Sequence, residues 1–454
     1  MKKNVIISGA GLVGSLLAIY LVRRGYRVRI FERRGDMRKE RMRAGRSINL
    51  ALSDRGLNAL EKVGLADTIR SIAIPMHGRQ IHNQDGSSAF QPYGKEGQSI
   101  LSVSRGMLNM TLMDLAESQG AELHFNHRCT QVDWSLQRIA FDGAAPEPVW
   151  HDFDLLFGAD GAFSATRMQH QLQHDQFNYS QYYIDCGYKE LTIPATASGD
   201  FALEKNALHI WPRKDYMLIA LPNPDRTFTC TLFFPFEGPT SFARLTTADA
   251  VRDFFETTFT DAVPLMPDYV SEFFANPTAS LVTVKCHPWV RGDHFALIGD
   301  AAHAIVPFFG QGMNCGFEDC RVLDDLIDDC GDDWMRILSE YQRLRKPDGD
   351  AIADLAILNF TEMRERTADP AFLFQKKIEA RLHERHPDRW IPAYSQVTFS
   401  PHIRYSEALR NGQRQEAVMK ELMRWPDILD RWDHPATEAW VLQRLAEVSA
   451  TDVG

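Results

Sequence analysis

The sequence is poor in paired cysteines and in clustered basic residues. Its seven cysteines are odd in number and include no CxxC pair, which excludes a disulfide framework and a zinc ribbon and favours a reducing compartment. The formal net charge is −10 and no dense Lys/Arg stripe with interleaved aromatic residues is present, so nucleic acid is not expected as a partner. Internal repeats and low-complexity tracts are also missing. We therefore expect a globular protein without a metal site.

Long hydrophobic runs are scarce too, with one exception at the N-terminus. No charged residue occurs from Asn4 to Val22, a length that would fit a membrane span or a signal anchor. Three glycines interrupt this run, and a second apolar strand, RVRIFE, follows it at once. This pattern favours a buried strand, a tight turn and a buried helix. The C-terminal stretch has no apolar run of that length, so we expect no membrane anchor.

The glycines of the N-terminal run follow the spacing of a dinucleotide-binding turn. They read GAGLVG after the strand NVIIS and before an apolar helix. Gly9 would permit the tight turn, Gly11 would let a pyrophosphate approach the backbone, and Gly14 would let helix and strand pack closely. The phosphates would then lie on free amides at the start of the helix. Glu32 ends the next strand, where it is placed to accept hydrogen bonds from an adenosine ribose.

Two later segments have the same order of apolar strand, acid and glycine. FDLLFGADGAFSATR occupies 153–167, and HFALIGDAAHAIVPFFGQGMNCGFED occupies 294–319. In the second, Asp300 closes the strand and a glycine-rich loop without charge follows. A carboxylate there could bind sugar hydroxyls, and amides at the start of the next helix could stabilise negative charge on a flat, electron-accepting ring. This combination indicates a flavin.

The rest of the chain divides into a sheet region and a helical region. With 454 residues and 44% hydrophobic content, two or three domains are expected. Short β-rich runs, one of them turning on Asp85-Gly86 like a hairpin, indicate an inserted antiparallel sheet. Beyond about residue 316 the pattern is helical, and EDCRVLDDLIDDCGDDW is interpreted as a solvated acidic helix face. We assign 1–75, 101–178 and 286–330 to a nucleotide-binding domain, 76–100 and 179–285 to a sheet domain, and 331–454 to a helical region.

The order of these motifs resembles the single-component aromatic hydroxylases that bind FAD. It runs GxGxxG, SVSRGMLNMTL, GADG, and then GDAAH with PFFGQGMN. A closer resemblance, to the members that convert L-kynurenine to 3-hydroxykynurenine, rests on GRSINLALSDRG (45–56), HGRQIH (77–82), QPYG (91–94) and IPAYSQVTFS (391–400). The resemblance implies an α/β fold, with a Rossmann-like FAD-binding domain of the aromatic hydroxylase type, an inserted antiparallel β-sheet substrate domain and a C-terminal helical region.

The resemblance also implies which residues form the site. The substrate-binding residues are Arg79, Tyr93, Asn359 and Tyr394. We further expect Pro307, Phe308 and Phe309, together with the C-terminal helices, to form the wall that faces the flavin and excludes water. The residues that contact FAD are Gly9, Gly11, Val13, Gly14, Phe31, Glu32, Arg33, Arg34, Ala51, Arg105, Cys129, Asp300, Gly312, Met313 and Asn314. The substrate pocket would therefore lie between the first hairpin and the C-terminal region.

The activity that the resemblance implies is an NADPH-dependent monooxygenation in tryptophan catabolism and NAD precursor synthesis. NADPH would reduce the flavin, O2 would add to give a C4a-hydroperoxide, and oxygen would pass to the ring carbon ortho to the aryl amine of L-kynurenine. Because the aniline nitrogen already activates the ring, we assign no catalytic acid or base. The site would act by positioning the substrate and by excluding water.

Other interpretations of single residues and of the whole chain are open. His303 matches no metal-ligand spacing and is expected to be packed and hydrogen-bonded. Cys315 and Cys320 are expected to be buried small hydrophobes. A hydroxylase of another aryl amine or phenol is one alternative function. A flavin halogenase would carry WxWxIP where this chain has one tryptophan, Trp390, before Ile-Pro, and the intact PFFGQGMN loop disfavours a non-catalytic escort protein of the Rab-inhibitor type.

The segment after the shared motifs differs from that of mitochondrial family members. Those members continue past the region of IRYSEALRNGQ with a hydrophobic anchor, whereas this chain continues as RQEAVMKELMRW and ends polar. We therefore expect a soluble, cytoplasmic protein of the bacterial type.

Overall fold

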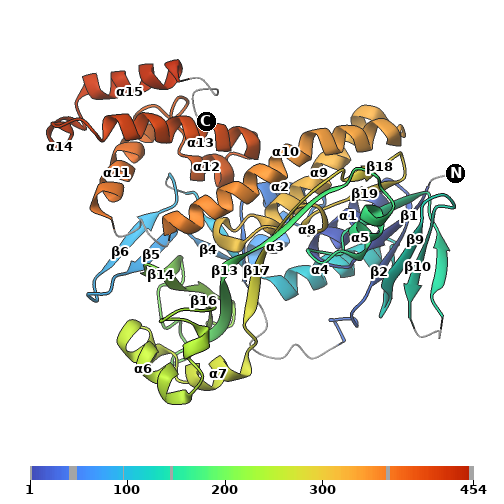
Figure 1. Cartoon of the computed structure of the whole chain (residues 1–454), viewed down its shortest axis with the longest axis horizontal. Coiled ribbons are helices and arrows are strands. Elements are labelled where there is room, and N and C mark those ends of the chain that lie inside the picture. Colours follow the sequence, from blue (N-terminus) through green and yellow to red (C-terminus); the bar gives the residue numbers. More distant parts are fainter. Residues whose placement is uncertain (1–2, 40–48, 96, 144–146, 364–368, 449–454) are drawn as a thin grey trace.

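A six-stranded sheet forms the nucleotide-binding side of the protein, on the right in Figure 1. The computed structural model describes residues 3–39, 49–95, 97–143, 147–363 and 369–448, so residues 45–48 of the GRSINLALSDRG motif lie outside the described residues. The strand order is β18-β19-β12-β1-β2-β8, parallel except for β18 with β19. The elements are β1 (Asn4–Ser8), α1 (Leu12–Arg23), β2 (Arg27–Glu32), β8 (Glu122–Phe125), β12 (Leu155–Gly158), β18 (Val290–Arg291) and β19 (Phe295–Leu297).

The register of this sheet brings the three glycine-containing motifs together. Ser8 at the end of β1 pairs with Gly158 of β12, and Gly158 pairs with Leu297 of β19. Because these strands are parallel, the turns that follow them leave the same edge of the sheet, which is where nucleotides bind in open α/β folds. The charge-free N-terminal run forms β1 and α1, whose apolar side chains are buried in the core of this domain. The prediction of a buried strand, turn and helix is confirmed.

Two small sheets and four helices complete this side of the molecule. One sheet has the order β3-β7-β4 and the other β11-β10-β9. The strands are β3 (Asn49–Leu52), β4 (Ile74–Met76), β7 (Ile100–Ser104), β9 (Arg128–Asp133), β10 (Arg138–Asp142) and β11 (Val149–Asp152). The helices are α2 (Asp54–Lys62), α3 (Ala66–Ile72), α4 (Arg105–Ser118) and α5 (Ala165–Leu172).

A seven-stranded sheet of order β17-β13-β16-β15-β14-β5-β6 lies beside the nucleotide-binding side of the protein. Helices α6 and α7 pack on this sheet at the bottom of Figure 1. The hairpin expected at Asp85-Gly86 is present, because β5 and β6 pair in antiparallel fashion around that turn. The expectation of a wholly antiparallel sheet is wrong at one place: β5 pairs with β14 in parallel. These two strands are far apart in the chain, so no tight turn forces them to be antiparallel. The elements are β5 (Gly78–His82), β6 (Ser88–Pro92), β13 (Asn178–Ile193), β14 (Ala207–Arg213), β15 (Tyr216–Pro222), β16 (Phe228–Pro235), η1 (Phe242–Arg244), α6 (Ala248–Thr258), η2 (Val263–Leu265), α7 (Tyr269–Ala275) and β17 (Ala279–His287).

Helices dominate the chain after β19, and the last of them gather at the upper left of Figure 1. A separate apolar cluster that includes Trp390, Val418 and Val441 holds these last helices together. Within the described ranges, no helix is both long enough and apolar enough to span a bilayer. The elements are α8 (Asp300–His303), η3 (Pro307–Phe309), α9 (Gly312–Cys330), α10 (Trp334–Thr361), α11 (Pro370–Arg385), α12 (Ala393–Phe399), α13 (Tyr405–Leu422), α14 (Ile428–Arg431) and α15 (Pro435–Glu447).

The acidic segment of α9 is not the solvated face that its composition suggested. Glu318 and Asp319 are 4% and 0% exposed. Both pair with the guanidinium of Arg345 from α10, at 2.7 Å in each case. A buried carboxylate needs a charged partner, and that partner lies too far along the chain for the local pattern to show it. Only the later acids of the segment are on the outside, where Asp324 and Asp328 pair with Arg24.

Candidate cofactor and substrate site

The turn between β1 and α1 has the shape that a bound pyrophosphate requires. Gly9 has a φ of +108°, and a Cβ there would lie 2.5 Å from the carbonyl oxygen of Ala159. A Cβ at Gly14 would lie 2.0 Å from the carbonyl oxygen of Gly9. A Cβ at Gly11, in contrast, would meet no atom within 4 Å. Gly9 and Gly14 are therefore needed for packing, whereas Gly11 leaves open space in front of the backbone.

The first turn of α1 offers unpaired amides to that space. Its N-cap residue, Gly11, provides no side-chain hydrogen bond. Two other helices of the same domain have side-chain caps, since Ser104 accepts a hydrogen bond at the start of α4 and Ser164 does so at the start of α5, whereas α2 and α3 have none. A helix that begins at a glycine turn without a side-chain cap is a good anion site. These observations fit the phosphates of a dinucleotide.

Glu32 supports the same turn from the end of β2. Its Oε2 accepts a hydrogen bond from the backbone amide of Ala10 at 3.0 Å, and its Oε1 accepts from Arg34. A carboxylate has further lone pairs, so a contact with a ribose stays a prediction. Phe31 is buried and stacks on Phe141, so any cofactor contact would come from its backbone. Arg33 and Arg34 are exposed beside it.

The start of α9 provides a second set of free amides. Gly312, Met313 and Asn314 are its first three residues, and Gln311 at the N-cap makes no side-chain cap hydrogen bond. The side chain of Asn314 is fully engaged within the protein. Its Oδ1 accepts from the amide of Ser53 at 3.0 Å, and its Nδ2 donates to the carbonyl oxygens of Ala51 and Gly310, each at 2.8 Å. A cofactor would therefore meet the backbone here, on a loop that Asn314 fixes in place.

The remaining residues predicted to contact the cofactor lie around the same edge of the sheet. Val13 packs against the glycines of the third motif, since a Cβ at Gly316 would lie 2.5 Å from its Cγ2. Asp300 is exposed and begins α8 rather than ending β19. Arg105 is exposed at the start of α4. Cys129 is buried in β9, and burial raises the pKa of its thiol, so only its backbone is available to a ligand.

Three of the four predicted substrate residues meet in one place. The guanidinium carbon of Arg79 lies 4.8 Å from the ring centroid of Tyr394 and 5.6 Å from that of Tyr93. The two tyrosine rings stack with centroids 5.6 Å apart. The Nε of Arg79 is buried without a hydrogen-bond partner in the described part of the chain. A half-buried guanidinium whose shielded Nε donor is unused suits a carboxylate ligand.

Asn359 and the aromatic loop form the adjoining wall. The Nδ2 of Asn359 donates to the carbonyl oxygen of Phe308 at 2.5 Å. Phe309 stacks on Tyr394 with ring centroids 5.2 Å apart, and the ring of Phe308 stacks on Phe360 at 4.1 Å. Both phenylalanines are buried, whereas Pro307 is exposed. Strand β5, helices α10 and α12 and the loop therefore converge, as expected for a pocket between the sheet and the C-terminal region.

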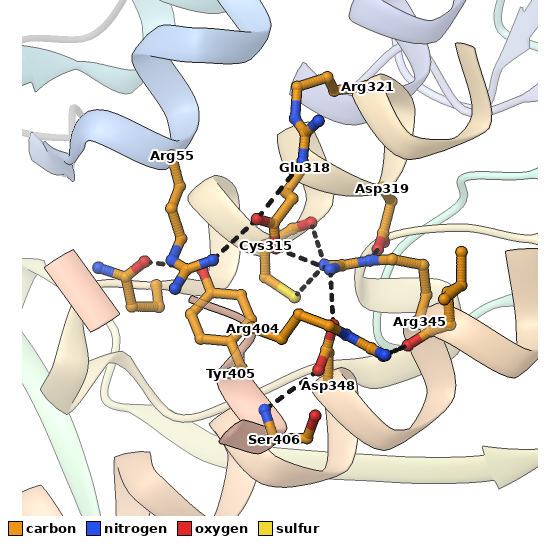
Figure 2. A network of polar contacts seen from close by, with 12 residues as sticks. Arg55, Cys315, Glu318, Asp319, Arg321, Arg345, Asp348, Arg404, Tyr405 and Ser406 are labelled. Carbon is orange, nitrogen blue, oxygen red and sulfur yellow. Dashed lines mark hydrogen bonds and ion pairs between the residues drawn. The ribbon is translucent and has the colours of Figure 1, made fainter. Parts of the chain in front are cut away.

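A buried cluster of charged side chains joins α9 to α10 (Figure 2). Asp319 binds the Nε2 of His303 at 2.6 Å and the Nε of Arg345 at 2.7 Å. Burial alone would lower the pKa of His303, but the Asp319 carboxylate outweighs it and raises that pKa well above its usual value. Burial would likewise raise the pKa of Asp319, yet His303 and Arg345 hold it low. His303 is thus packed and hydrogen-bonded, as its spacing predicted.

The thiol of Cys315 belongs to this cluster, so its interpretation as a plain hydrophobe was incomplete. Arg345 donates to its Sγ at 3.3 Å, and the Nδ1 of His303 lies 3.8 Å from it. Ligand atoms of His303, Cys315 and Asp319 all lie within 4.8 Å of one another, a spacing that a metal ion could use. The guanidinium of Arg345 already donates to two of the three, and a metal cation would face that positive charge.

Sequence reasoning missed the residues that support the loop from behind. Arg55 is 1% exposed and binds α9 and the C-terminal region. Tyr405 is buried, and its hydroxyl donates to the Oε1 of Gln311 at 2.9 Å. Arg55 lies within the GRSINLALSDRG motif, which was the only signal in the sequence. Nothing in a single sequence distinguishes a buried arginine from an exposed one.

Taken together, the observed geometry fits FAD. Two uncapped helix starts, an open space at Gly11 and a carboxylate at Glu32 match its phosphates and sugars. The aromatic wall and the Arg79 cluster lie at the loop that leads into α9. The residues present would hold the cofactor with its ring near Gly312–Asn314.

Comparison with known proteins gives the same result. The chain matches the FAD binding domain family over residues 2–355. It is 51% identical to a kynurenine 3-monooxygenase of Flavobacterium johnsoniae, over 97% of this chain and 98% of that protein. It is 45% identical to the kynurenine 3-monooxygenase of Sus scrofa, over 92% of this chain and 88% of that protein. The solved structure of a tetrameric 2-methyl-3-hydroxypyridine-5-carboxylic acid oxygenase is similar with a TM-score of 0.67 and 21% identity, covering 82% of this chain and 95% of that one, which confirms the predicted fold.

Proposed function

The chain belongs to the kynurenine 3-monooxygenase family of FAD-dependent aromatic hydroxylases, and on this premise we propose that it hydroxylates L-kynurenine at the ring carbon ortho to the amine. NADPH and O2 are the co-substrates. The observation that carries the proposal is the position of the half-buried Arg79, close to Tyr93 and Tyr394 beside the loop that precedes α9. The activity is that of an oxidoreductase of tryptophan catabolism.

When bound, FAD supplies the redox chemistry that takes a hydride from NADPH and activates O2 for transfer. The protein supplies the electrostatics around it. Backbone amides of Gly312, Met313 and Asn314 stand at the positive end of the α9 dipole, where they would stabilise negative charge on the reduced ring. The interactions of Asn314 with Ala51 and Ser53 hold these amides in place before the reaction begins.

The substrate is held at its amino-acid end. The Arg79 guanidinium would bind the carboxylate, and the hydroxyls of Tyr93 and Tyr394 would donate to the same end. Burial raises the pKa of both tyrosines, so both remain protonated donors at neutral pH. With this end fixed, the distance of the aryl amine from the cofactor ring is set by the length of the substrate itself. No side-chain base is required, because the aniline nitrogen makes the ortho carbon electron-rich.

The aromatic wall keeps water away from the reacting atoms. Phe308 packs between Phe360 and Phe233, and Phe309 covers Tyr394. These rings make this side of the pocket apolar. Water at this position would divert the activated oxygen to hydrogen peroxide. The wall therefore determines how much of the NADPH is used productively.

Purification and a substrate panel test the proposal. The protein should show the visible spectrum of a bound flavin, and kynurenine should stimulate NADPH oxidation with formation of 3-hydroxykynurenine. Salicylate, 4-hydroxybenzoate and anthranilate should not be hydroxylated. Hydroxylation of a phenol but not of kynurenine would assign the chain to another substrate, and a colourless protein that takes up no FAD would refute the assignment altogether.

Two further expectations remain proposals. The division into a nucleotide-binding domain, a sheet domain and a C-terminal helical region is supported by the separate apolar clusters of the sheet domain and of the last helices. The start of α10 packs in the nucleotide-binding cluster, and a further cluster joins the sheet to α10, α12 and α13. A cytoplasmic location is the second of these proposals, and cell fractionation would test it.

A further inference from the structure

Arg55 is a buried arginine of α2 that binds two distant parts of the chain at once (Figure 2). Its Nη1 donates to the Oε1 of Glu318 in α9 at 2.8 Å. Its Nε donates to the carbonyl oxygen of Val397 at 2.7 Å, and its Nη2 donates to that of Gln396 at 3.1 Å. The Nη2 also reaches the carbonyl oxygens of Ser400 and Ile403. One guanidinium thus joins α9 to the segment that contains α12.

The carbonyls that Arg55 binds are those that α12 cannot satisfy by itself. This helix spans seven residues, Ala393–Phe399, which is too short for a helix to be stable alone. The last four carbonyls of any α-helix have no partner within the helix. Arg55 donates to those of Gln396 and Val397, and its charge complements the negative end of the helix dipole. It therefore acts as the C-terminal cap of α12.

The position of α12 determines the position of a substrate residue. Tyr394 is the second residue of this helix. Its ring lies between Phe309 and Tyr93, at centroid distances of 5.2 Å and 5.6 Å. It also lies 4.8 Å from the guanidinium carbon of Arg79. A shift of α12 would move Tyr394 against the group expected to bind the substrate carboxylate.

The same stretch of chain, residues 51–56, also fixes the loop expected to hold the flavin ring. Ala51 and Ser53 bind the side chain of Asn314. Gly56 lets α2 approach that side chain, since a Cβ at Gly56 would lie 2.4 Å from the Oδ1 of Asn314. Arg55, which caps α12, thus lies in the same short stretch of chain as Ala51, Ser53 and Gly56, which hold the start of α9.

A second link runs through Tyr405. The guanidinium carbon of Arg55 lies 4.1 Å from the ring centroid of Tyr405. The hydroxyl of Tyr405 donates to Gln311, the residue that precedes α9. Arg55 is therefore connected to the start of α9 through Tyr405 and Glu318. It is connected to the substrate residue Tyr394 through α12.

We propose that Arg55 is a positioning residue of the hydroxylation reaction, which fixes the position of the substrate pocket relative to the loop that leads into α9. This inference rests on the proposed function, because that relative position matters only if an activated oxygen must reach a bound substrate ring. Arg55 does not touch the pocket residues in this structure; it acts through α12 and Tyr405. If the substrate ring is displaced from the cofactor, activated oxygen is released as hydrogen peroxide instead of being transferred.

Arg55→Lys is the test, because lysine keeps the charge but loses the planar fork of donors. One ammonium cannot reach Glu318 and the carbonyls at the end of α12 together. Arg321→Lys is the matched control. Arg321 lies 3.8 Å from the same Oε1 of Glu318 and pairs with Asp325, but it is partly exposed and the structure gives it no contact with α12.

Two readouts are measured on the purified, FAD-loaded proteins. In Arg55→Lys, backbone amides of residues 393–400 should exchange with deuterium about tenfold faster, with FAD content unchanged. The amount of 3-hydroxykynurenine formed per NADPH oxidised should fall at least about threefold, and hydrogen peroxide should account for the rest of the NADPH oxidised. Arg321→Lys should match the parent protein in both. Unchanged coupling in Arg55→Lys, with the parent active on kynurenine, overturns the inference.

A second variant decides the matter if Arg55→Lys does not fold. Tyr405→Phe keeps the ring under Arg55 but removes the hydrogen bond to Gln311, so it should lower coupling without changing exchange in α12. Normal coupling in Tyr405→Phe would then refute the inference. Failure of the proposed function looks different: the parent protein itself would not hydroxylate kynurenine, while faster exchange of residues 393–400 in Arg55→Lys would still show that Arg55 holds α12.

Discussion

Replacement of Arg79 by methionine should abolish most of the substrate affinity and leave the cofactor in place. Methionine keeps an apolar stem between Tyr93 and Tyr394 but removes every donor of the guanidinium. A bidentate contact with the substrate carboxylate consists of two charge-assisted hydrogen bonds, each contributing about 1.5 kcal/mol or more. Their loss, about 3 kcal/mol, corresponds to a fall of about 100-fold in kcat/KM for kynurenine.

The assay is steady-state formation of 3-hydroxykynurenine over a range of substrate concentrations, together with the flavin absorbance per protein. The effect should be mainly in KM, since the carboxylate is bound equally before and during oxygen transfer. Arg213→Met is the control. Arg213 is buried on the neighbouring strand β14, but it donates to the carbonyl oxygens of Thr258 and His82, so its loss should lower the melting temperature and leave KM unchanged.

Two results would refute this reasoning. Loss of bound FAD from Arg79→Met would show that Arg79 belongs to the cofactor site. A KM equal to that of the parent protein would show that the carboxylate binds elsewhere, and that the unpaired Nε of Arg79 has another partner in solution.

Three other perturbations have defined outcomes. Arg345→Met removes the buried cation that Glu318, Asp319 and Asp348 share, although Glu318 keeps Arg55 and Asp319 keeps His303, and should destabilise the protein by about 3 kcal/mol in urea unfolding; a change below about 1 kcal/mol would contradict the ion-pair description. The raised pKa of His303 means that its pairing with Asp319 stabilises the fold fully below pH 6.5, its ordinary pKa, and that this stabilisation is lost as the pH rises through the folded pKa. Parent stability should therefore fall more than that of His303→Gln as the pH rises above 6.5, and equal slopes would argue against a charged histidine. Gly14→Ala places a Cβ 2.0 Å from the carbonyl oxygen of Gly9 and should weaken FAD binding in a fluorescence titration. Gly64→Ala, whose added Cβ meets no atom within 4 Å but whose φ is +68°, should lower stability without weakening FAD binding.

Local patterns were sufficient to predict the nucleotide-binding elements. The glycines at 9, 11 and 14 stand between a β-rich and an apolar helical run, and each of these signals is contained within a few residues of chain. The hairpin at Asp85-Gly86 was predictable for the same reason. Of the site, the candidate residues came from resemblance to a family, and the structure brings Arg79, Tyr93 and Tyr394 together.

Long-range pairing could not be predicted in the same way. The acids of α9 have one local pattern, but Glu318 and Asp319 are buried because Arg345 and Arg55 reach them from other helices. The parallel pairing of β5 with β14 depends on tertiary packing and not on any turn. In both cases a single sequence shows which residues are present, but it does not show which distant residues they contact.

The interleaving of the two large sheets has a consequence for synthesis on the ribosome. The hairpin that carries Arg79 ends at Pro92, yet its inner neighbour β14 begins at Ala207. The strand next to β12 in the nucleotide sheet, β19, begins only at Phe295. Nascent chains must therefore keep both sheets incomplete until well past mid-length, so stalled or truncated products would expose unpaired strand edges. Heterologous expression should improve more from slower translation or chaperone supply than from trimming either end of the gene.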